Sequence, residues 1–430
     1  MKAETLILSV GKCSWGACYA CGWGKLEGKY TEEQTKQLIQ KRALKGVKKL
    51  KVFASGSFLD DKQFSPQFRE WFAEYIKSQG IQELVIESRP EYITPDALKP
   101  FKGLKLTVAI GLESANDEVL KKYAKGFTSE DFLNAVKVLH DSGAKVRAYV
   151  MVNIPFGTKA DFDKTMEFAI EHADEIVAIN TFPHSKAPLF DLWIKGEWKP
   201  LDKKEFEEWV GKWKDNPKVE TDFENYLFVP KFPPEKRVKI VGATSESLNH
   251  PHFEVWQDYL QRFYEPRKKE LLLFLPCSYR KPYPKSQTHQ KIFKALKRTG
   301  HLREIQRTVV STPGVVPIEF SDYYPFNSYD WPEWEETPEI KQEYIQVTAE
   351  RVKKFLKAHA EKYKVIACYF KPDSETYQAI QQATKELGIS VPNLLDEATW
   401  EEVKDKKNPV GQKESLATLT AGVKRLLGGQ

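Results

Sequence analysis

Six short apolar runs alternate with amphipathic patterns of helical period between residues 4 and 180. The runs are rich in β-branched residues and read TLILSV, KVFAS, ELVIES, LTVAIGL, KVRAYVMV and EIVAIN. A strand that returns in the same direction must cross over through a helix, so strands that alternate with helices predict a parallel sheet. Six such units fall short of the eight of a closed barrel. We therefore expect an α/β fold that begins with a partial (β/α)6 barrel.

The pattern loosens after Trp198, and a second series of strand and helix patterns begins at LLLFL, residues 271–275. A chain of 430 residues with 41% hydrophobic residues is long enough to bury two cores. We expect a first domain over 1–235, a linker with a connecting helix over 236–268, and a smaller α/β domain over 269–430. The last twenty or so residues are polar, and we expect them to fray.

Three of the five cysteines, Cys13, Cys18 and Cys21, lie directly after the first predicted strand. An odd number of thiols argues against a disulfide framework, and the opening MKAETLILSV lacks the pattern of a secretory signal. A structural zinc site takes four ligands, usually in two close pairs, so zinc is the weaker alternative. Three thiolates on a four-iron cluster leave one iron open to bind a substrate or cofactor. The spacing Cys-x4-Cys-x2-Cys therefore favours an iron–sulfur cluster.

Polar residues and glycines follow the next four predicted strands where those strands end. The segments are ASGSFLDD, IESRPEYIT, IGLESAND and MVNIPFGT, residues 54–61, 86–94, 110–117 and 151–158. Taken singly, a residue such as Gly56 or Glu113 is explained as well by turn geometry or by a solvated loop. Four successive strand ends beside a cysteine triplet favour a site instead, because α/β folds place their chemistry at the carboxyl ends of the strands.

These segments, with the phrase KGFTSEDFLNAVKVLHDSGAKVRAYVMV, resemble the radical S-adenosylmethionine subunit of archaeosine synthase and, more distantly, the catalytic subunit of Elongator. The resemblance covers roughly residues 5 to 205. It implies that the three cysteines bind a 4Fe–4S cluster whose open iron holds S-adenosylmethionine. It further implies that the cofactor is contacted by Ser55, Gly56, Ser57, Arg89 and Glu113. Asn153 is expected on the substrate side, where NIPFGT and NTFPHS depart from the family pattern.

A second motif, PCSYRKPYPKSQTH at residues 276–289, follows the predicted strand LLLFL. It resembles the P-C-x3-K-P-Y-x2-S-x2-H motif of the other archaeosine synthase subunit, which attaches lysine to a cyano-deazaguanine base in transfer RNA. Residues 316–330, VPIEFSDYYPFNSYD, resemble that subunit as well. The resemblance implies that Tyr283 and Ser286 bind substrate.

The chemistry of this motif follows from its cysteine. A thiolate adds readily to a nitrile and gives a thioimidate, which an amine displaces to give an amidine. Cys277 is the candidate nucleophile, and Lys281 or His289 would lower its pKa or carry the proton. The alternative is that Cys277 only packs while the motif binds the base or phosphates. Cys368, in the apolar run KVIACYF, is expected in the core.

Basic residues gather between Arg267 and Arg307, where twelve Lys or Arg accompany two Glu. Tyr279, Tyr283 and Phe293 lie within this stretch, and the mixture is typical of a nucleic-acid footprint, with a solvated face as the alternative. No apolar run reaches the length of a membrane span. We therefore expect a cytoplasmic protein with no membrane partner.

The two motifs describe consecutive steps, so the leading hypothesis is one transfer RNA-modifying enzyme that forms the formamidine of archaeosine. The second domain, a lysine transferase, would join lysine to the nitrile. The first domain, a C–N lyase, would take hydrogen from the lysine carbon next to the new nitrogen and break the carbon–nitrogen bond. The expected partners are transfer RNA with a deazaguanine base, lysine, and an electron donor such as ferredoxin.

Three alternatives stay open. In one, the second domain only docks the substrate for a separate lysine-transferase subunit. In another, the chain is a non-catalytic RNA-binding protein whose cysteines hold zinc. Modified DNA or a free base is open as the substrate in place of transfer RNA.

Overall fold

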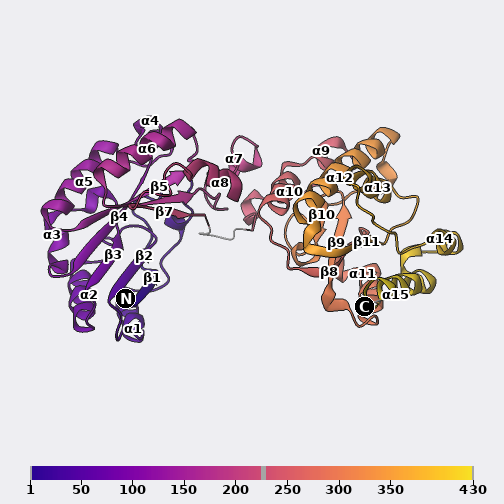
Figure 1. Cartoon of the computed structure of the whole chain (residues 1–430), viewed down its shortest axis with the longest axis horizontal. Helices are drawn as coiled ribbons and strands as arrows, with labels where there is room; N and C mark the ends of the chain where they lie inside the picture. The colour runs from indigo at the N-terminus through magenta and orange to yellow at the C-terminus, as the bar shows by residue number, and fades with distance from the viewer. Residues whose placement is uncertain (1, 224–228, 429–430) are drawn as a thin grey trace. The chain divides into compact units, whose positions relative to one another are not determined.

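The computed structural model describes residues 2–223 and 229–428, and it divides into two compact units, Met1–Phe228 and Val229–Gln430 (Figure 1). Helix α10 (Pro251–Arg262), which lies within the segment predicted as a linker, belongs to the second unit and buries Trp256 there. Among the described residues, no helix is long and apolar enough to cross a membrane.

The first unit is built on seven parallel strands that lie side by side in chain order. They are β1 (Ala3–Leu8), β2 (Lys49–Ala54), β3 (Glu83–Glu87), β4 (Lys105–Glu113), β5 (Lys145–Val152), β6 (Glu175–Asn180) and β7 (Val219–Asp222). The sheet is a curled half-barrel, so the predicted partial barrel is confirmed. The seventh strand was not predicted, because its sequence VETD holds one apolar residue and two of its four residues are exposed.

Helices connect these strands, and Figure 1 shows most of them along one side of the sheet. They are α1 (Glu32–Gln40), α2 (Pro66–Ser78), α3 (Pro95–Leu98), α4 (Asp117–Lys122), α5 (Ser129–Asp141), α6 (Lys159–His172), α7 (Leu189–Ile194) and α8 (Lys203–Val210). Thr31, Thr128 and Thr158 begin α1, α5 and α6 with capping boxes, in which the threonine hydroxyl accepts a backbone N–H three residues on.

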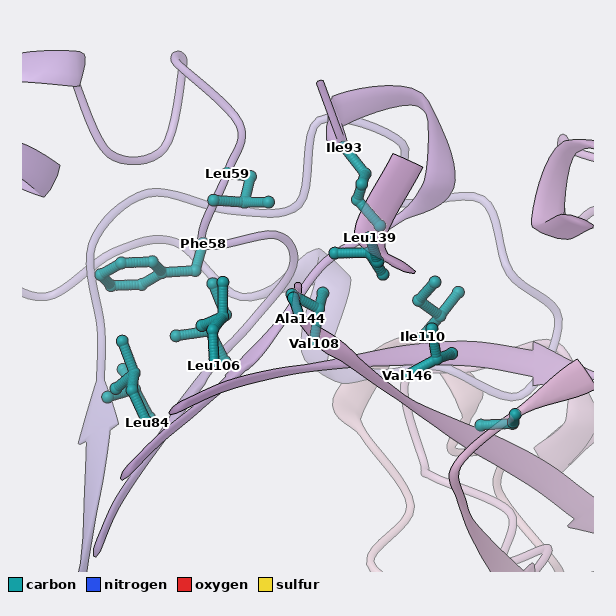
Figure 2. Close-up of a cluster of buried hydrophobic side chains, with 14 of the residues drawn as sticks. Phe58, Leu59, Leu84, Ile93, Leu106, Val108, Ile110, Leu139, Ala144 and Val146 are labelled. Carbon is teal, nitrogen blue, oxygen red and sulfur yellow. The ribbon is translucent and has the colours of Figure 1, made fainter. Parts of the chain in front are cut away.

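The core of the first unit lies between the sheet and these helices. Figure 2 shows Val108 of β4 and Val146 of β5 close to Leu139 of α5, and all three side chains are fully buried. Successive strand residues point to opposite faces, so Glu87 of β3 and Tyr149 of β5 point away from this core. The other face of the sheet is therefore free to carry polar side chains.

The second unit is built on a four-stranded sheet in the order β10-β9-β8-β11. Its strands are β8 (Lys269–Leu275), β9 (Ile305–Ser311), β10 (Gly314–Pro317) and β11 (Tyr363–Cys368). Strands β9 and β11 run parallel to β8, whereas β10 pairs antiparallel with β9. Besides α10, the helices are α9 (Ser245–Leu248), α11 (Gln287–Lys297), α12 (Pro338–His359), α13 (Glu375–Leu387), α14 (Glu397–Val403) and α15 (Lys413–Leu427). The predicted second α/β fold is confirmed.

The last described helix contradicts the prediction that the final residues fray. Residues Lys413–Leu427 form α15, which packs against α11. Ser415, Leu419, Gly422 and Val423 are buried, and their spacing places them on one face of the helix. The prediction was wrong because four buried positions among polar residues are enough to hold a helix on a neighbouring surface.

Replacing Leu419 by Ala is expected to lower the free energy of unfolding of the second unit by about 2–5 kcal/mol, because the side chain is fully buried. Denaturant titration measures this change. Lys424→Ala on the exposed side of α15 is the matched control and should change stability by less than about 0.5 kcal/mol. Equal effects of the two substitutions would show that the end of the chain does not pack.

Candidate functional site

The loop between β1 and α1 carries the three predicted cluster ligands. Its ends are tied together, because the N–H of Tyr30 donates to the carbonyl of Ser9 at 3.1 Å. Its middle is tied to two other segments: the N–H of Tyr19 donates to the carbonyl of Tyr123, after α4, at 2.9 Å, and the N–H of Leu189, in α7, donates to the carbonyl of Tyr19 at 3.1 Å. The loop is therefore held at the carboxyl edge of the sheet.

Within this loop the cysteines lie around Gly24. The N–H of Gly24 donates to Cys21 Sγ at 3.3 Å, and the N–H of Cys21 donates to the carbonyl of Cys18 at 3.2 Å. A Cβ atom on Gly24 would stand 3.2 Å from Cys13 Cβ and 3.7 Å from Cys21 Sγ, so the glycine keeps this space open. The structure thus brings the three half-buried cysteines together.

The donor set fits a four-iron cluster, for which thiolates are the usual protein ligands. Burial raises the pKa values of Cys18 and Cys21 above the ordinary value; the ammonium group of Lys125 opposes part of this rise at both cysteines, and the N–H of Gly24 does so at Cys21. Metal binding needs deprotonated cysteines, so the positive charge of Lys125 favours the thiolates that a cluster requires. Among the described residues, no group of three or more His, Cys, Asp or Glu side chains is arranged to hold a single metal ion.

The predicted cofactor segment after β2 is organised by Gln63, which the sequence analysis did not identify. Gln63 Oε1 accepts the N–H of Ser57 at 2.7 Å, and its Nε2 donates to the carbonyl of Ser55 at 3.5 Å. A Cβ atom on Gly56 would stand 2.2 Å from Gln63 Oε1, so glycine is required for this close approach. Ser57 Oγ accepts the N–H of Arg89 at 3.0 Å, which joins the segments after β2 and β3.

Arg89 is buried, and its guanidinium lies 4.9 Å from the ring centroid of Trp15 and 5.2 Å from that of Phe127. Its Nη1 donates to the carbonyl of Lys125 at 2.9 Å, and its Nε donates to Glu91 at 2.5 Å. Its Nη2 is buried and has no hydrogen-bond partner among the described residues. A buried donor without an acceptor is costly, so this nitrogen suits an acceptor on a ligand, such as the carboxylate of an amino acid group.

Glu113, the last predicted cofactor residue, is half-buried and forms an ion pair with the buried Lys125 at 2.8 Å. Glu113 has a φ of 65°, at the point where β4 shifts register against β5. A Cβ atom on Gly111 would stand 2.4 Å from Glu113 Oε1 and 2.9 Å from Lys125 Nζ, so the glycine leaves room for the pair. Burial lowers the pKa of Lys125, but Glu113 and Cys18 outweigh burial and raise it above its ordinary value. The phrase KGFTSED contained Lys125, yet nothing in it marked this lysine as a partner of Glu113.

Glu87, at the end of β3, lies in one of the four strand-end segments that favoured a site, but the sequence analysis gave it no role there. Burial raises its pKa to about 7, while hydrogen bonds to the backbone of Ala54 and to Tyr149 oppose this rise. Burial also raises the pKa of Tyr149, so the phenol keeps its proton at neutral pH. A carboxyl group that titrates near neutral pH, on the face turned away from the core, is suited to exchange a proton.

Asn153, predicted on the substrate side, holds a neighbouring segment in place. Its Nδ2 donates to the carbonyl of Lys199 at 2.8 Å, and its own carbonyl accepts Trp198 Nε1 at 3.1 Å. At the same edge of the sheet, His184 follows β6 and lies against the cysteine loop, because a Cβ atom on Gly22 would stand 1.8 Å from His184 Nδ1. Nothing in the sequence linked Gly22 to His184, so the sequence analysis missed this contact.

In the second unit, the half-buried Cys277 follows β8. Its Sγ lies 3.2 Å from the hydroxyl of Tyr329, which also lies 3.0 Å from Tyr283 Oη and 2.5 Å from Ser311 Oγ. Lys281 Nζ lies 4.0 Å from the centroid of the Tyr329 ring. Three residues of the predicted motif are thus gathered with Tyr329 and Ser311, which the sequence analysis did not name.

Two other motif residues hold the local fold. Ser286 caps α11, because its Oγ accepts the N–H of His289 at 3.1 Å. His289 Nε2 donates to the carbonyl of Pro276 at 2.9 Å, and burial lowers the pKa of His289 to about 4, so the ring is neutral. These bonds tie the start of α11 to the residue before Cys277. Cys368 is fully buried in the core, as predicted.

The basic stretch of residues 267–307 is only partly a surface. Tyr279 is 80% exposed, whereas Tyr283 is fully buried and presents no ring to a nucleic acid. Lys291 Nζ donates to the carbonyl of Gly411 at 3.2 Å and so takes part in packing. The exposed basic residues toward the end of α11 are Lys294, Lys297 and Arg298.

Residues 10–169 match the radical S-adenosylmethionine superfamily, and residues 253–420 match a domain of unknown function, DUF5591. Archaeosine synthase subunit beta of Thermococcus kodakarensis is 32% identical over 201 residues, which are 43% of this chain and 62% of that protein. Subunit alpha of Methanosarcina acetivorans is 28% identical over 193 residues, 44% of this chain and 29% of that protein. The chain thus spans less than two thirds of either relative.

Among solved structures, queuine lyase from Clostridium spiroforme bound to SAM and queuine is 20% identical, with a TM-score of 0.40, and the alignment covers 51% of this chain and 90% of that one. The archaeal Methanocaldococcus infernus Elp3 is 19% identical, with a TM-score of 0.36, and the alignment covers 52% of this chain and 57% of that one. The superfamily match confirms the predicted radical S-adenosylmethionine domain and its cofactors, a 4Fe–4S cluster and S-adenosylmethionine.

Replacing Cys18 by Ala is expected to abolish cluster binding, because two thiolates do not hold four irons firmly. Iron and sulfide content and the visible spectrum of the anaerobically purified protein measure this loss. Cys277→Ala, a cysteine of similar burial in the other unit, should keep the cluster. A Cys18→Ala protein with the full iron content would overturn the ligand assignment.

Proposed function

We propose that this chain, which carries a radical S-adenosylmethionine domain and a DUF5591 domain, is a transfer RNA-modifying enzyme that forms the formamidine of archaeosine. The second unit adds lysine to the nitrile of a cyano-deazaguanine base, and the first unit breaks the carbon–nitrogen bond of that adduct. The observation that carries this proposal is the presence, in one chain, of a gathered cysteine triplet and of a cysteine motif whose side chains converge on Tyr329. The relatives named as archaeosine synthase subunit beta and subunit alpha support it, because proteins of both names are similar to this one chain.

In the first unit, a cluster and S-adenosylmethionine, when bound, supply the radical that starts carbon–nitrogen cleavage. The residues of this chain hold and orient the reactants. Arg89 Nη2 offers a buried donor for the carboxylate of the cofactor, beside the paired charges of Glu113 and Lys125. Glu87 and Tyr149 form the adjoining polar surface. The carboxyl group of Glu87, whose pKa is about 7, exchanges a proton with the amine of the bound lysine adduct.

In the second unit, Cys277 is the nucleophile that adds to the nitrile carbon. Cys277 is half-buried, whereas Tyr329 and Ser311 around its sulfur are buried, so a substrate would approach at Cys277. The ammonium group of Lys281, over the Tyr329 ring, favours negative charge on the sulfur and on the nitrile nitrogen during addition. Ser286 and His289 keep the loop before α11 in position. The amine of lysine then displaces the sulfur and forms the amidine.

A second candidate function has its own support. The relatives named as subunits alpha and beta are separate proteins, and the chain spans 29% of one such alpha subunit. In this alternative the second unit docks the transfer RNA, and a separate lysine-transferase subunit makes the adduct. In both cases the substrate is a deazaguanine-modified transfer RNA in the cytoplasm, and the electron donor is a protein such as ferredoxin.

Replacing Cys277 by Ala is expected to abolish addition of lysine and to spare cleavage of the adduct, because the adduct contains no nitrile. Mass spectrometry of nucleosides measures both steps, with cyano-deazaguanine transfer RNA plus lysine for the first and the preformed adduct for the second. Cys368→Ala, at a fully buried core cysteine of β11, is the control and should retain both steps.

The outcomes separate the candidates. If the Cys277→Ala protein forms the adduct at the normal rate, Cys277 is not the nucleophile and only packs. A wild-type protein that cleaves the adduct and cannot form it would establish the docking alternative. A colourless protein that contains zinc and no iron would favour a non-catalytic RNA-binding protein.

Reversing Lys294, Lys297 and Arg298 to Glu is expected to weaken transfer RNA binding and to flatten its salt dependence, because each lost phosphate contact reduces counterion release. Filter binding at several salt concentrations measures both effects, and the loss should be ~10-fold or more at low salt. Lys354, Lys357 and Lys385, exposed on α12 and α13, are the matched control for reversal. Equal affinities of the two triple variants for transfer RNA would show that the RNA-binding surface lies elsewhere.

A further inference from the structure

The hydroxyl of Tyr329 is the centre of a hydrogen-bond cluster that includes the sulfur of Cys277. It has three partners: Cys277 Sγ at 3.2 Å, Tyr283 Oη at 3.0 Å and Ser311 Oγ at 2.5 Å. Tyr329, Tyr283 and Ser311 are 3%, 0% and 1% exposed, whereas Cys277 is half-buried. A substrate therefore approaches this cluster at Cys277, and a group bonded to its sulfur lies within reach of the Tyr329 hydroxyl, which is 3.2 Å from that sulfur.

The number of protons in the cluster decides which hydrogen bonds the Tyr329 hydroxyl donates and which it accepts. A phenol has one hydrogen to donate and two lone pairs to accept with. When Tyr283 and Ser311 both donate to Tyr329 Oη, its lone pairs are used and its hydrogen is left for the sulfur. When the cysteine is a thiol and donates to Tyr329 Oη, only one of Tyr283 and Ser311 donates to that oxygen as well, and the phenol hydrogen is available to the other hydroxyl or to a substrate. The cluster thus allows a proton to enter Tyr329 from the sulfur side as another leaves it.

The surroundings keep Tyr329 a neutral acid. Burial raises its pKa well above the ordinary value, so the phenol does not lose its proton in the resting protein. Lys281 Nζ, 4.0 Å from the ring centroid, supplies the positive charge that eases a transient loss of that proton. His289 is not placed for this task, because its Nε2 is taken by the carbonyl of Pro276 and its ring is neutral.

We propose that Tyr329 is the proton donor to the nitrile nitrogen when Cys277 adds to the nitrile carbon, with Tyr283 and Ser311 as positioning residues. The inference rests on the proposed function of the second unit. The sulfur forms the carbon–sulfur bond, one π bond of the nitrile breaks, and its electron pair takes the Tyr329 proton. The thiol proton passes to the Tyr329 oxygen, so the product is a neutral thioimidate and the phenol is restored. No oxidant or reductant is needed.

The test compares two reactions of the same sulfur in the full-length protein. Addition of the nitrile needs a proton at nitrogen, whereas alkylation by iodoacetamide expels iodide and needs none. Cyano-deazaguanine transfer RNA, without lysine, is the nitrile probe. Acid quenching and mass spectrometry of the Cys277 peptide measure the rates of thioimidate formation and of alkylation.

Tyr329→Phe is expected to slow thioimidate formation ~100-fold or more, the usual contribution of a positioned acid, and to change the rate of alkylation of Cys277 less than ~10-fold. Tyr283→Phe and Ser311→Ala, which keep the Tyr329 hydroxyl, should give smaller losses in the nitrile reaction only. Tyr369→Phe removes another buried hydroxyl of this unit, bonded to the carbonyl of Val410, and should leave both rates unchanged. Thermal unfolding of each variant reports whether it folds.

Other results overturn the inference. A folded Tyr329→Phe protein that forms the thioimidate at the wild-type rate shows that the proton comes from elsewhere, while the proposed function stands. Equal losses in both reactions show that Tyr329 only shapes the pocket around the sulfur. A wild-type protein whose Cys277 is alkylated but never forms a thioimidate removes both the proposed function of this unit and the inference built on it.

Discussion

In the first unit all seven strands run in one direction, and the site depends on this parallel order. Each strand returns to the starting edge through a crossover, so every strand ends at the same opposite edge. Residues that are far apart in the chain therefore meet there. The N–H of Arg89, after β3, reaches Ser57 Oγ, after β2, and the side chain of Arg89 reaches the carbonyl of Lys125, beyond β4. The cysteine loop after β1 lies on this connected layer through Trp15 and Cys18.

This layer holds buried charges, which are costly unless they are paired. Lys125 and Glu113 satisfy each other at 2.8 Å, and Gly111 lacks a side chain where one would collide with them. Removing either partner would leave an uncompensated charge at a cost of about 3–5 kcal/mol. Arg89 is satisfied only in part, because its Nη2 has no acceptor among the described residues. A ligand with an acceptor atom would supply the hydrogen bond that Arg89 Nη2 lacks and so remove the free-energy cost of this unsatisfied donor.

In the second unit, one half-buried cysteine, Cys277, lies against buried hydroxyl groups. The motif around Cys277 divides into residues that shape the backbone and residues that face the sulfur. Ser286 and His289 hold the turn into α11 by bonds to backbone groups. Tyr283 reaches the sulfur only through the hydroxyl of Tyr329. The motif is therefore a folding unit, and the hydrogen bonds around its sulfur are completed by Tyr329 and Ser311, which lie outside it.

The sequence by itself determined the first six strands of the first unit with the helices between them, the cysteine triplet and the motif around Cys277, because these depend on neighbours in the chain. Hydrophobic period and caps act over a few residues, and so they are visible without a structure. Only the tertiary structure decided that Lys125 pairs with Glu113, that α15 packs on α11, and that Tyr329, 52 residues beyond Cys277, bonds to its sulfur. A pattern in the chain records which residues are apolar or polar. Which polar groups meet is decided by the crossovers and by the edge at which the strands end.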